Sequence, residues 1–118
     1  MNIKKLHIVN GKVDDIDMLL ISCLLNPMDY RVVKGRCYEH EFESVGVAYH
    51  EDCIDEVEVE VDGRPFGRVI NDLYNIYLTG RVDMRDIIFI AETEREWYVQ
   101  FGLREILDII KEEEEEEL

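Results

Sequence analysis

The chain has 118 residues, of which 47% are apolar and 35% are charged, and its 28 acids and 13 bases give a formal net charge of −15. This length suits a single domain, and the apolar fraction excludes a chain that is disordered throughout. The negative charge disfavours direct nucleic-acid binding and attachment to anionic membranes, because both surfaces would repel it, and it favours a basic protein partner.

The N-terminal segment predicts a strand followed by a helix. Ile3 to Val9 form the strand, and Asp14 or Asp15 caps a helix that runs to about Leu25. Asn26-Pro27 ends this helix, because the residue before a proline avoids helical geometry. The helix is apolar on every face, which is typical of a helix that is fully buried or lies at a subunit interface. We therefore expect a homodimer.

Alternating apolar and charged residues in the middle of the chain predict three strands. The first is Tyr30 to Val33, followed by a bend at Gly35, and the second is Tyr38 to Glu43. The third contains Glu56 to Val61, which has the clearest strand pattern in the chain. Asp62-Gly63 closes this strand as a turn.

The C-terminal half predicts two helices with a pair of strands between them. The first helix runs from Arg68 to Thr79, and the strands are Asp86 to Ala91 and Glu96 to Phe101. The last helix starts near Leu103 and runs into consecutive glutamates. These repel one another and lie at the helix end where the macrodipole disfavours anions. We therefore expect residues 112–118 to form a frayed acidic tail.

These elements follow the order β-α-β-β-β-α-β-β-α and predict a single α+β domain over residues 1–111. Because short turns join neighbouring strands, we expect a mostly antiparallel sheet with about three helices packed on one face. No apolar run approaches the roughly 20 residues that cross a bilayer, and no secretory signal opens the chain. We therefore expect no contact with membranes and a cytoplasmic protein.

The polar composition indicates the kind of source organism. Serine, threonine and glutamine are scarce, whereas charged residues are abundant. Such a balance is typical of proteins that work at high temperature. We expect a thermophilic source, either archaeal or a virus of such a host.

Cysteine and histidine cluster between residues 37 and 53. Two residues separate Cys37 from His40, and two separate His50 from Cys53, which is the spacing of metal-binding knuckles. A Cys2His2 set suits tetrahedral zinc, which would also stabilise a small fold. A strand over residues 38–43 argues against zinc, because residues three apart on a strand point to opposite faces. The alternatives are a Cys37–Cys53 disulfide and reduced cysteines beside half-buried histidines, and we prefer the last.

Two rows of glutamates alternate with apolar residues, and each row shares one face of a predicted strand. The six residues are Glu39, Glu41, Glu43, Glu56, Glu58 and Glu60. Neighbouring rows would make an anionic sheet face that docks a basic partner or imitates a phosphate backbone. The alternative is a solvated strand face that binds nothing.

Motifs of the common catalytic sites are missing from the sequence, including the P-loop, G-x-S-x-G and H-E-x-x-H. The loop Gly63–Gly67 carries Arg64 and precedes a helix, where an anion could bind, although a structural loop explains it more simply. We therefore expect an interaction or regulatory protein that docks a basic partner, for example an inhibitor of a nucleic-acid-binding protein. The alternatives are a zinc-stabilised domain and a small enzyme with an acidic and histidine pocket.

Overall fold

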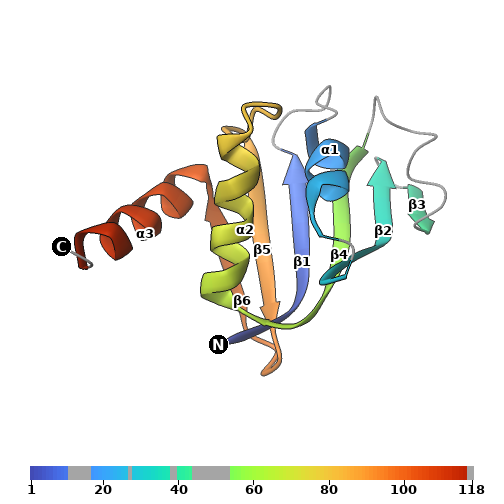
Figure 1. Cartoon of the computed structure of the whole chain (residues 1–118). Helices are drawn as coiled ribbons and strands as arrows, with labels where there is room; N and C mark the ends of the chain where they lie inside the picture. Colours follow the sequence, from blue (N-terminus) through green and yellow to red (C-terminus); the bar gives the residue numbers. More distant parts are fainter. Residues whose placement is uncertain (11–16, 27, 38–39, 44–53, 117–118) are drawn as a thin grey trace.

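The computed structural model of the chain describes residues 1–10, 17–26, 28–37, 40–43 and 54–116 (Figure 1). Within these ranges the elements follow the predicted order β-α-β-β-β-α-β-β-α. They are β1 (Asn2–Asn10), α1 (Asp17–Leu24), β2 (Tyr30–Cys37), β3 (His40–Glu43), β4 (Ile54–Pro65), α2 (Phe66–Leu78), β5 (Ile87–Thr93), β6 (Tyr98–Gly102) and α3 (Leu103–Glu116).

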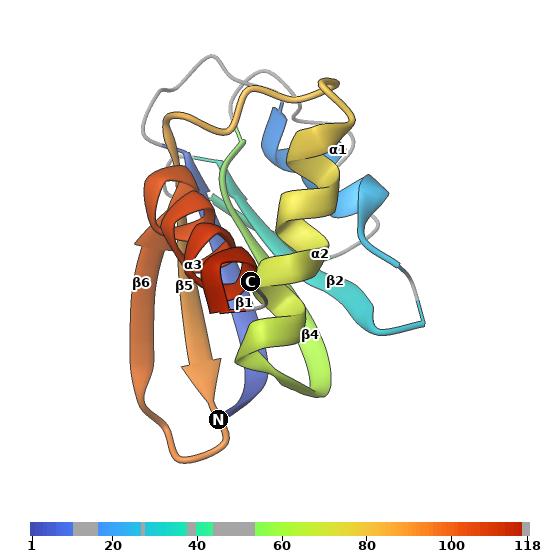
Figure 2. The same ribbon diagram turned by 60° about the vertical axis from the view of Figure 1, so that its left-hand side comes forward.

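The strands form one sheet in the order β3-β2-β4-β1-β5-β6, and every neighbouring pair is antiparallel. The α+β class with an antiparallel sheet is therefore confirmed. Helices α1 and α2 cover one face of the sheet, and α3 extends outward from the end of β6 (Figures 1 and 2). Among the described residues, no helix covers the opposite face. None of the described helices combines the length and apolarity needed to span a membrane.

The core lies between the sheet and the helices and follows from the period-two alternation of the strands. Val57, Val59 and Val61 of β4 are buried, and the glutamates between them are half-buried on the opposite face. β5 repeats this alternation around Phe89. The inner face of α2 has helical spacing and consists of Val69, Ile70, Leu73 and Ile76.

Three phenylalanines connect the edge of the sheet to α2. The ring centroid of Phe101 in β6 lies 5.4 Å from that of Phe89 in β5, and the two rings are stacked. On its other side, Phe101 lies 5.4 Å from Phe66 at the start of α2 in an edge-to-face contact. The Phe66 side chain is partly buried and packs against the core.

Two glycines do not interrupt strands as the sequence suggested. β2 continues through Gly35, where a bend was expected, and pairs with both β3 and β4 there. β4 continues past Asp62-Gly63, where a turn was expected, to Pro65. The register between β1 and β4 shifts at this point, and Gly63 has a φ of 59°. A glycine accepts this left-handed geometry easily, so the chain forms a bulge rather than a turn.

Helix α1 buries one side against the sheet. Ile21 is buried, as is Leu25 directly after the helix, whereas Cys23 is exposed. The predicted start of this helix at Asp14 or Asp15 lies outside the described residues. A homodimer formed through α1 stays a prediction.

Helix α3 begins with a local cap and continues into the glutamates. Glu105 Oε2 accepts a hydrogen bond from the Gly102 N–H at 2.9 Å. Hydrogen bonds from the amides of Glu105 itself and of Gly102 lower the pKa of the Glu105 carboxyl. Ile106 and Ile110 are buried, and the helix continues to Glu116. Fraying of residues 112–118 stays a prediction.

Candidate functional site

The sheet face that carries no helix presents a row of glutamates on β4. Glu56, Glu58 and Glu60 alternate with buried valines and share this face, as the sequence predicted. β4 is an inner strand, with β2 on one side and β1 on the other. The net charge of the row therefore depends on what these two neighbours carry.

On one side, β1 places basic groups against the row. The register pairs Lys5 with Glu60 and His7 with Glu58. The Lys5 Nζ atom lies 3.8 Å from Glu58 Oε1, and His7 Nδ1 lies 3.2 Å from Glu56 Oε1. The side chains of β1 thus contact Glu56 and Glu58, and the strand register places Lys5 opposite Glu60.

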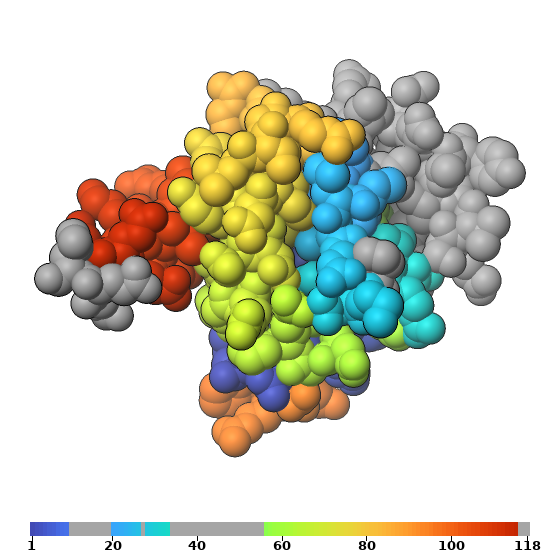
Figure 3. All heavy atoms as spheres, in the orientation of Figure 1, coloured from blue at the N-terminus to red at the C-terminus, as the bar shows by residue number. Residues whose placement is uncertain are grey.

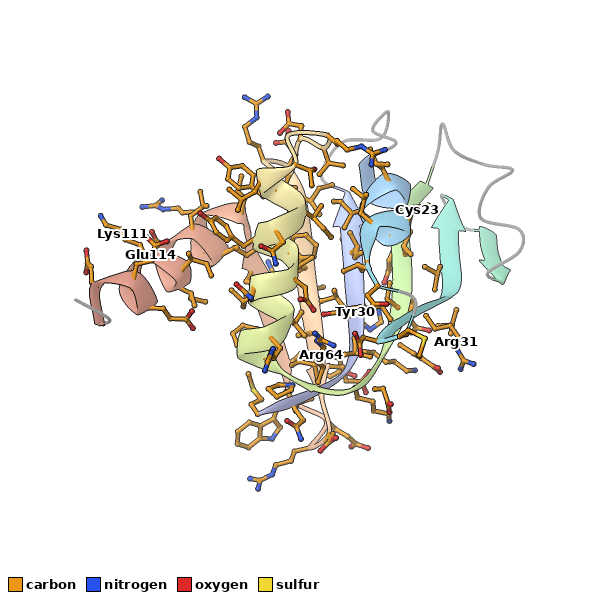
Figure 4. All side chains as sticks on the ribbon, viewed as in Figure 1. Cys23, Tyr30, Arg31, Arg64, Lys111 and Glu114 are labelled. Carbon is orange, nitrogen blue, oxygen red and sulfur yellow. The ribbon has the colours of Figure 1, made fainter. Side chains whose placement is uncertain are left out.

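On the other side, β2 places more basic residues beside the same row. Arg31 is paired in register with Glu60 and forms an ion pair with it (Figure 4). Further along β2, Lys34 and Arg36 occupy the backbone positions paired with Glu58 and Glu56. Lys5 and Arg31 therefore form ion pairs with two of the three glutamates of this row, Glu58 and Glu60.

The second predicted row does not extend this surface. Glu39 lies outside the described residues, and Glu41 and Glu43 belong to β3. β3 pairs with β2 and not with β4, so the two rows are separated by a strand that carries bases. Because β2 lies between β3 and β4 in the sheet, the two rows are not on neighbouring strands, and the condition for one continuous anionic face is not met.

Two of the four predicted zinc ligands lie within the described residues. Cys37 ends β2 and His40 begins β3, and their Cα positions are paired across the two antiparallel strands. Because Cys37 and His40 lie on two different strands, the argument against zinc from a single strand does not apply to this pair. Residues 38 and 39 lie outside the described residues. His50 and Cys53 lie outside the described residues. The zinc site and the Cys37–Cys53 disulfide stay predictions.

A second cluster of charged groups, the Arg64 cluster, consists of Asp29, Tyr30, Arg64 and Asp72. Arg64 Nη1 lies 2.6 Å from Asp29 Oδ2, and Arg64 Nε lies 3.0 Å from Asp72 Oδ2. The Tyr30 hydroxyl donates a hydrogen bond to Asp72 Oδ2 at 2.7 Å. The guanidinium lies 5.8 Å from the centroid of the Tyr30 ring, and the two side chains meet where β2 and β4 approach α2 (Figure 4).

The electrostatics of the Arg64 cluster indicate a structural role. Burial and the hydrogen bond to Asp72 raise the pKa of Tyr30 well above its ordinary value. A tyrosine held in this protonated form is neither a nucleophile nor a general base near neutral pH. Burial alone would lower the pKa of Arg64, but attraction to Asp72, Tyr30 and Asp29 raises it.

One nitrogen of the cluster is held by charge alone. Arg64 Nε is buried and makes no hydrogen bond of acceptable geometry within the described part of the chain, although Asp72 Oδ2 is 3.0 Å away. We treat that contact as Coulombic attraction. Arg64 was expected in a loop that is either structural or able to bind an anion. It lies instead near the end of β4 and pairs with Asp29 and Asp72, two carboxylates from distant segments whose approach no linear pattern signals.

Three hollows lie on the described surface, with volumes of about 390, 410 and 230 Å³. The smallest opens between α1 and α2 beside Asp72. The described residues that line these hollows include no histidine, cysteine or serine. No group of three or more potential metal ligands occurs among the described residues either. The small-enzyme alternative gains no support from these surfaces.

The acidic end of α3, which we define as Glu112–Glu115, differs from the β4 row. All four side chains are exposed, and the last turn of the helix contains no base. Within the described ranges, none of the ion pairs involves these glutamates. The space-filling view shows α3 extending beyond α2 at the side of the molecule (Figure 3). Lys111 directly precedes these four glutamates, so the segment 111–115 carries a formal net charge of −3 away from the sheet.

Comparisons with protein-family models, with curated proteins and with solved structures find no match to this chain.

We expect the Arg64 cluster to make folding stability depend on alkaline pH. The folded-state pKa of Tyr30 lies above its ordinary value of 10.0. The contribution of Tyr30 to the free energy of unfolding is therefore complete below about pH 10. It is lost as the pH rises further, because the unfolded chain releases a proton that the folded chain keeps. Tyr30→Phe should remove this part of the pH dependence and cost about 1.5 kcal/mol for the lost hydrogen bond.

Urea unfolding at a series of pH values from neutral to strongly alkaline measures this effect. Tyr98→Phe is the matched control, because the Tyr98 side chain is 63% exposed and the substitution should leave the wild-type pH dependence intact. An equal alkaline slope in wild type and Tyr30→Phe would contradict the role given to Tyr30.

Proposed function

We propose that this protein is an interaction or regulatory protein that docks a basic partner through the acidic end of α3. The distribution of charge supports the proposal. Lys5 and Arg31 form ion pairs with Glu58 and Glu60 on the sheet, whereas the last turn of α3 contains no base and four glutamates follow the single Lys111. Of the two acidic surfaces that the sequence offers for docking, the sheet face and the C-terminal tail, we therefore favour the tail.

The position of these glutamates is unfavourable for the helix that carries them. Neighbouring like charges repel, and carboxylates at the C-terminal end face the negative end of the macrodipole. A segment whose charges destabilise its own helix, without a compensating contact in the fold, is typical of a functional site. Binding of a positively charged partner explains this run of glutamates better than a contribution to folding stability does.

The geometry of α3 also suits docking. The helix holds the acidic end away from the sheet, so a partner can approach it without contacting the core elements (Figures 1 and 3). Opposite charge would speed the encounter and make binding sensitive to salt. The basic groove of a nucleic-acid-binding protein is the partner class that fits, because it is built to accept a row of negative charges. An inhibitor of such a protein is the concrete form of the proposal.

The test replaces Glu112, Glu113, Glu114 and Glu115 together by glutamine, which keeps side-chain size and helix propensity. Binding to poly-lysine, measured by isothermal titration calorimetry at low salt, should weaken by about tenfold or more, because the main electrostatic attraction is lost. The melting temperature should stay the same or rise, because repulsion within the helix is removed.

A variant that loses a similar number of glutamate charges provides the control. Replacing Glu56, Glu58 and Glu60 by glutamine removes three charges from the row on β4, and poly-lysine binding should change little. Equal weakening by both variants would show that only total charge matters and would overturn the proposal. Wild-type binding that persists unchanged at high salt would overturn it as well.

A further inference from the structure

The two edges of the sheet differ in charge. β3, at one edge, has the sequence His-Glu-Phe-Glu, whereas β6, at the other edge, has the sequence Tyr-Val-Gln-Phe-Gly. Charged residues and prolines on edge strands prevent pairing with strands of other molecules. β6 has neither, so it lacks the protection that the sequence of β3 provides.

The direction of the backbone groups in β6 follows from its pairing with β5. The Thr93 N–H donates to the Trp97 carbonyl at 2.8 Å. Hydrogen-bonded positions recur at every second residue along an antiparallel pair. In the observed register, Val99 and Phe101 therefore direct their N–H and C=O groups to β5.

The residues between them direct their backbone groups to the free edge. These are Tyr98, Gln100 and Gly102, and the N–H of Gly102 is already satisfied by Glu105. Tyr98 and Gln100 each present one donor and one acceptor. Within the described part of the chain, no strand pairs with this edge.

Two large aromatic side chains stand at the start of the same edge. The exposed fraction is 67% for Trp97 and 63% for Tyr98. Tryptophan and tyrosine are enriched at the centres of protein interfaces, where they bury large areas. The edge therefore offers side-chain anchors in addition to backbone pairing.

We propose that β6 pairs with β6 of a second copy of this chain, antiparallel and about a two-fold axis at Val99. In this register Tyr98 lies opposite the partner's Gln100, and the symmetric pair forms as well. Each of these residue pairs exchanges both of its backbone hydrogen bonds. Every outward group of Tyr98 and Gln100 is then satisfied, and Gly102 keeps its bond to Glu105. Trp97 comes beside the partner's Phe101.

Charge favours a second copy at this edge over the other surfaces. A chain with a net charge of −15 repels its copy, but β6 itself is uncharged. Glu112 lies nine residues beyond Leu103, about 14 Å along the helix at 1.5 Å per residue. That distance exceeds the Debye length of about 8 Å at physiological salt.

The dimer would join two sheets into one and carry two acidic helix ends. A basic partner with two suitable sites would then bind both acidic helix ends of the dimer, and the second contact would form more readily because the first holds it nearby. This inference stands apart from the docking proposal, because it rests on the backbone of β6 and not on α3. It also places the expected homodimer at the edge of the sheet rather than at α1.

Gln100→Pro tests the pairing directly. Proline removes the outward N–H of Gln100 and no bond to β5, so the monomer fold should survive. Sedimentation velocity of the full chain from micromolar to millimolar concentration should show a dimer for wild type. The dissociation constant should rise by about tenfold or more in Gln100→Pro, because two of the intermolecular bonds are lost. Gln100→Ala keeps the N–H and should dimerise like wild type.

A second variant and a second readout keep the test decisive if Gln100→Pro fails to fold. Tyr98→Glu changes an exposed side chain and adds like charges across the edge, so it should also abolish the dimer. The single tryptophan, Trp97, should shift its emission to shorter wavelength as wild type dimerises. A wild-type protein that is monomeric at millimolar concentration would overturn the proposal. This outcome would leave the edge available to an extended segment of another protein instead. A Gln100→Pro variant that dimerises as tightly as wild type would overturn it too.

Discussion

Replacing Arg64 with methionine lowers the free energy of unfolding by about 2–3 kcal/mol, because Asp29 and Asp72 lose the cation that they share. Removing one partner of a fully buried ion pair costs about 3–5 kcal/mol. The side chains of Arg64, Asp29 and Asp72 are 23%, 33% and 26% exposed, so solvent screening reduces the effect. Chemical denaturation monitored by circular dichroism measures the difference.

Two further variants separate this explanation from a simple loss of packing. Arg85→Met removes an exposed arginine that pairs with Asp83, and it should leave stability unchanged. Combining Arg64→Met with Asp29→Asn and Asp72→Asn removes the uncompensated charge and should recover most of the loss. If the triple variant is as unstable as Arg64→Met alone, the cost lies in packing rather than in charge.

Phe101→Ala should lower the free energy of unfolding by about 3–5 kcal/mol. The side chain is only 4% exposed, and its ring fills the space between Phe66 and Phe89. Removing it leaves a cavity at the point where β6, β5 and the start of α2 meet. Thermal and urea denaturation measure the loss.

Hydrogen exchange shows where the effect of Phe101→Ala is concentrated. Amides of β6 and the first turn of α3 should exchange faster, whereas those of β1 and β4 should keep their relative protection. Val99→Ala is the control on the same strand, because Val99 is only half-buried and should cost less. Equal losses from both substitutions would contradict the central place given to Phe101.

The order of the elements could be predicted because local periodicity determines it. The alternation of valine and glutamate in β4 and the helical spacing of the apolar residues in α2 each indicate one structure. Boundaries at glycine could not be predicted in the same way. Gly35 lies within β2, and Gly63 lies in a bulge of β4. Glycine permits turns, bends and bulges alike, so the neighbouring strands decide which of these forms.

The candidate site depended on contacts that local patterns do not encode. The sequence correctly placed Glu56, Glu58 and Glu60 on one face. It could not show that Lys5 and Arg31 come from the two strands beside them, because strand order is a property of the whole sheet. The Arg64 cluster was hidden for the same reason. The charge at the end of α3 was visible directly, because an uninterrupted run of glutamates needs no partner strand to be recognised.

The central position of β1 has a consequence for synthesis on the ribosome. β1 is synthesised before β4 and β5, yet it lies between them in the sheet, and His7 pairs with Glu58 on one side and with Ile90 on the other. The nascent chain must therefore hold an incomplete sheet until the strand around Ile90 has emerged. Until β5 is synthesised, the edge of β1 that pairs with it is unpaired and could pair with a strand of a neighbouring nascent chain. Correct folding therefore depends on rapid synthesis of β5.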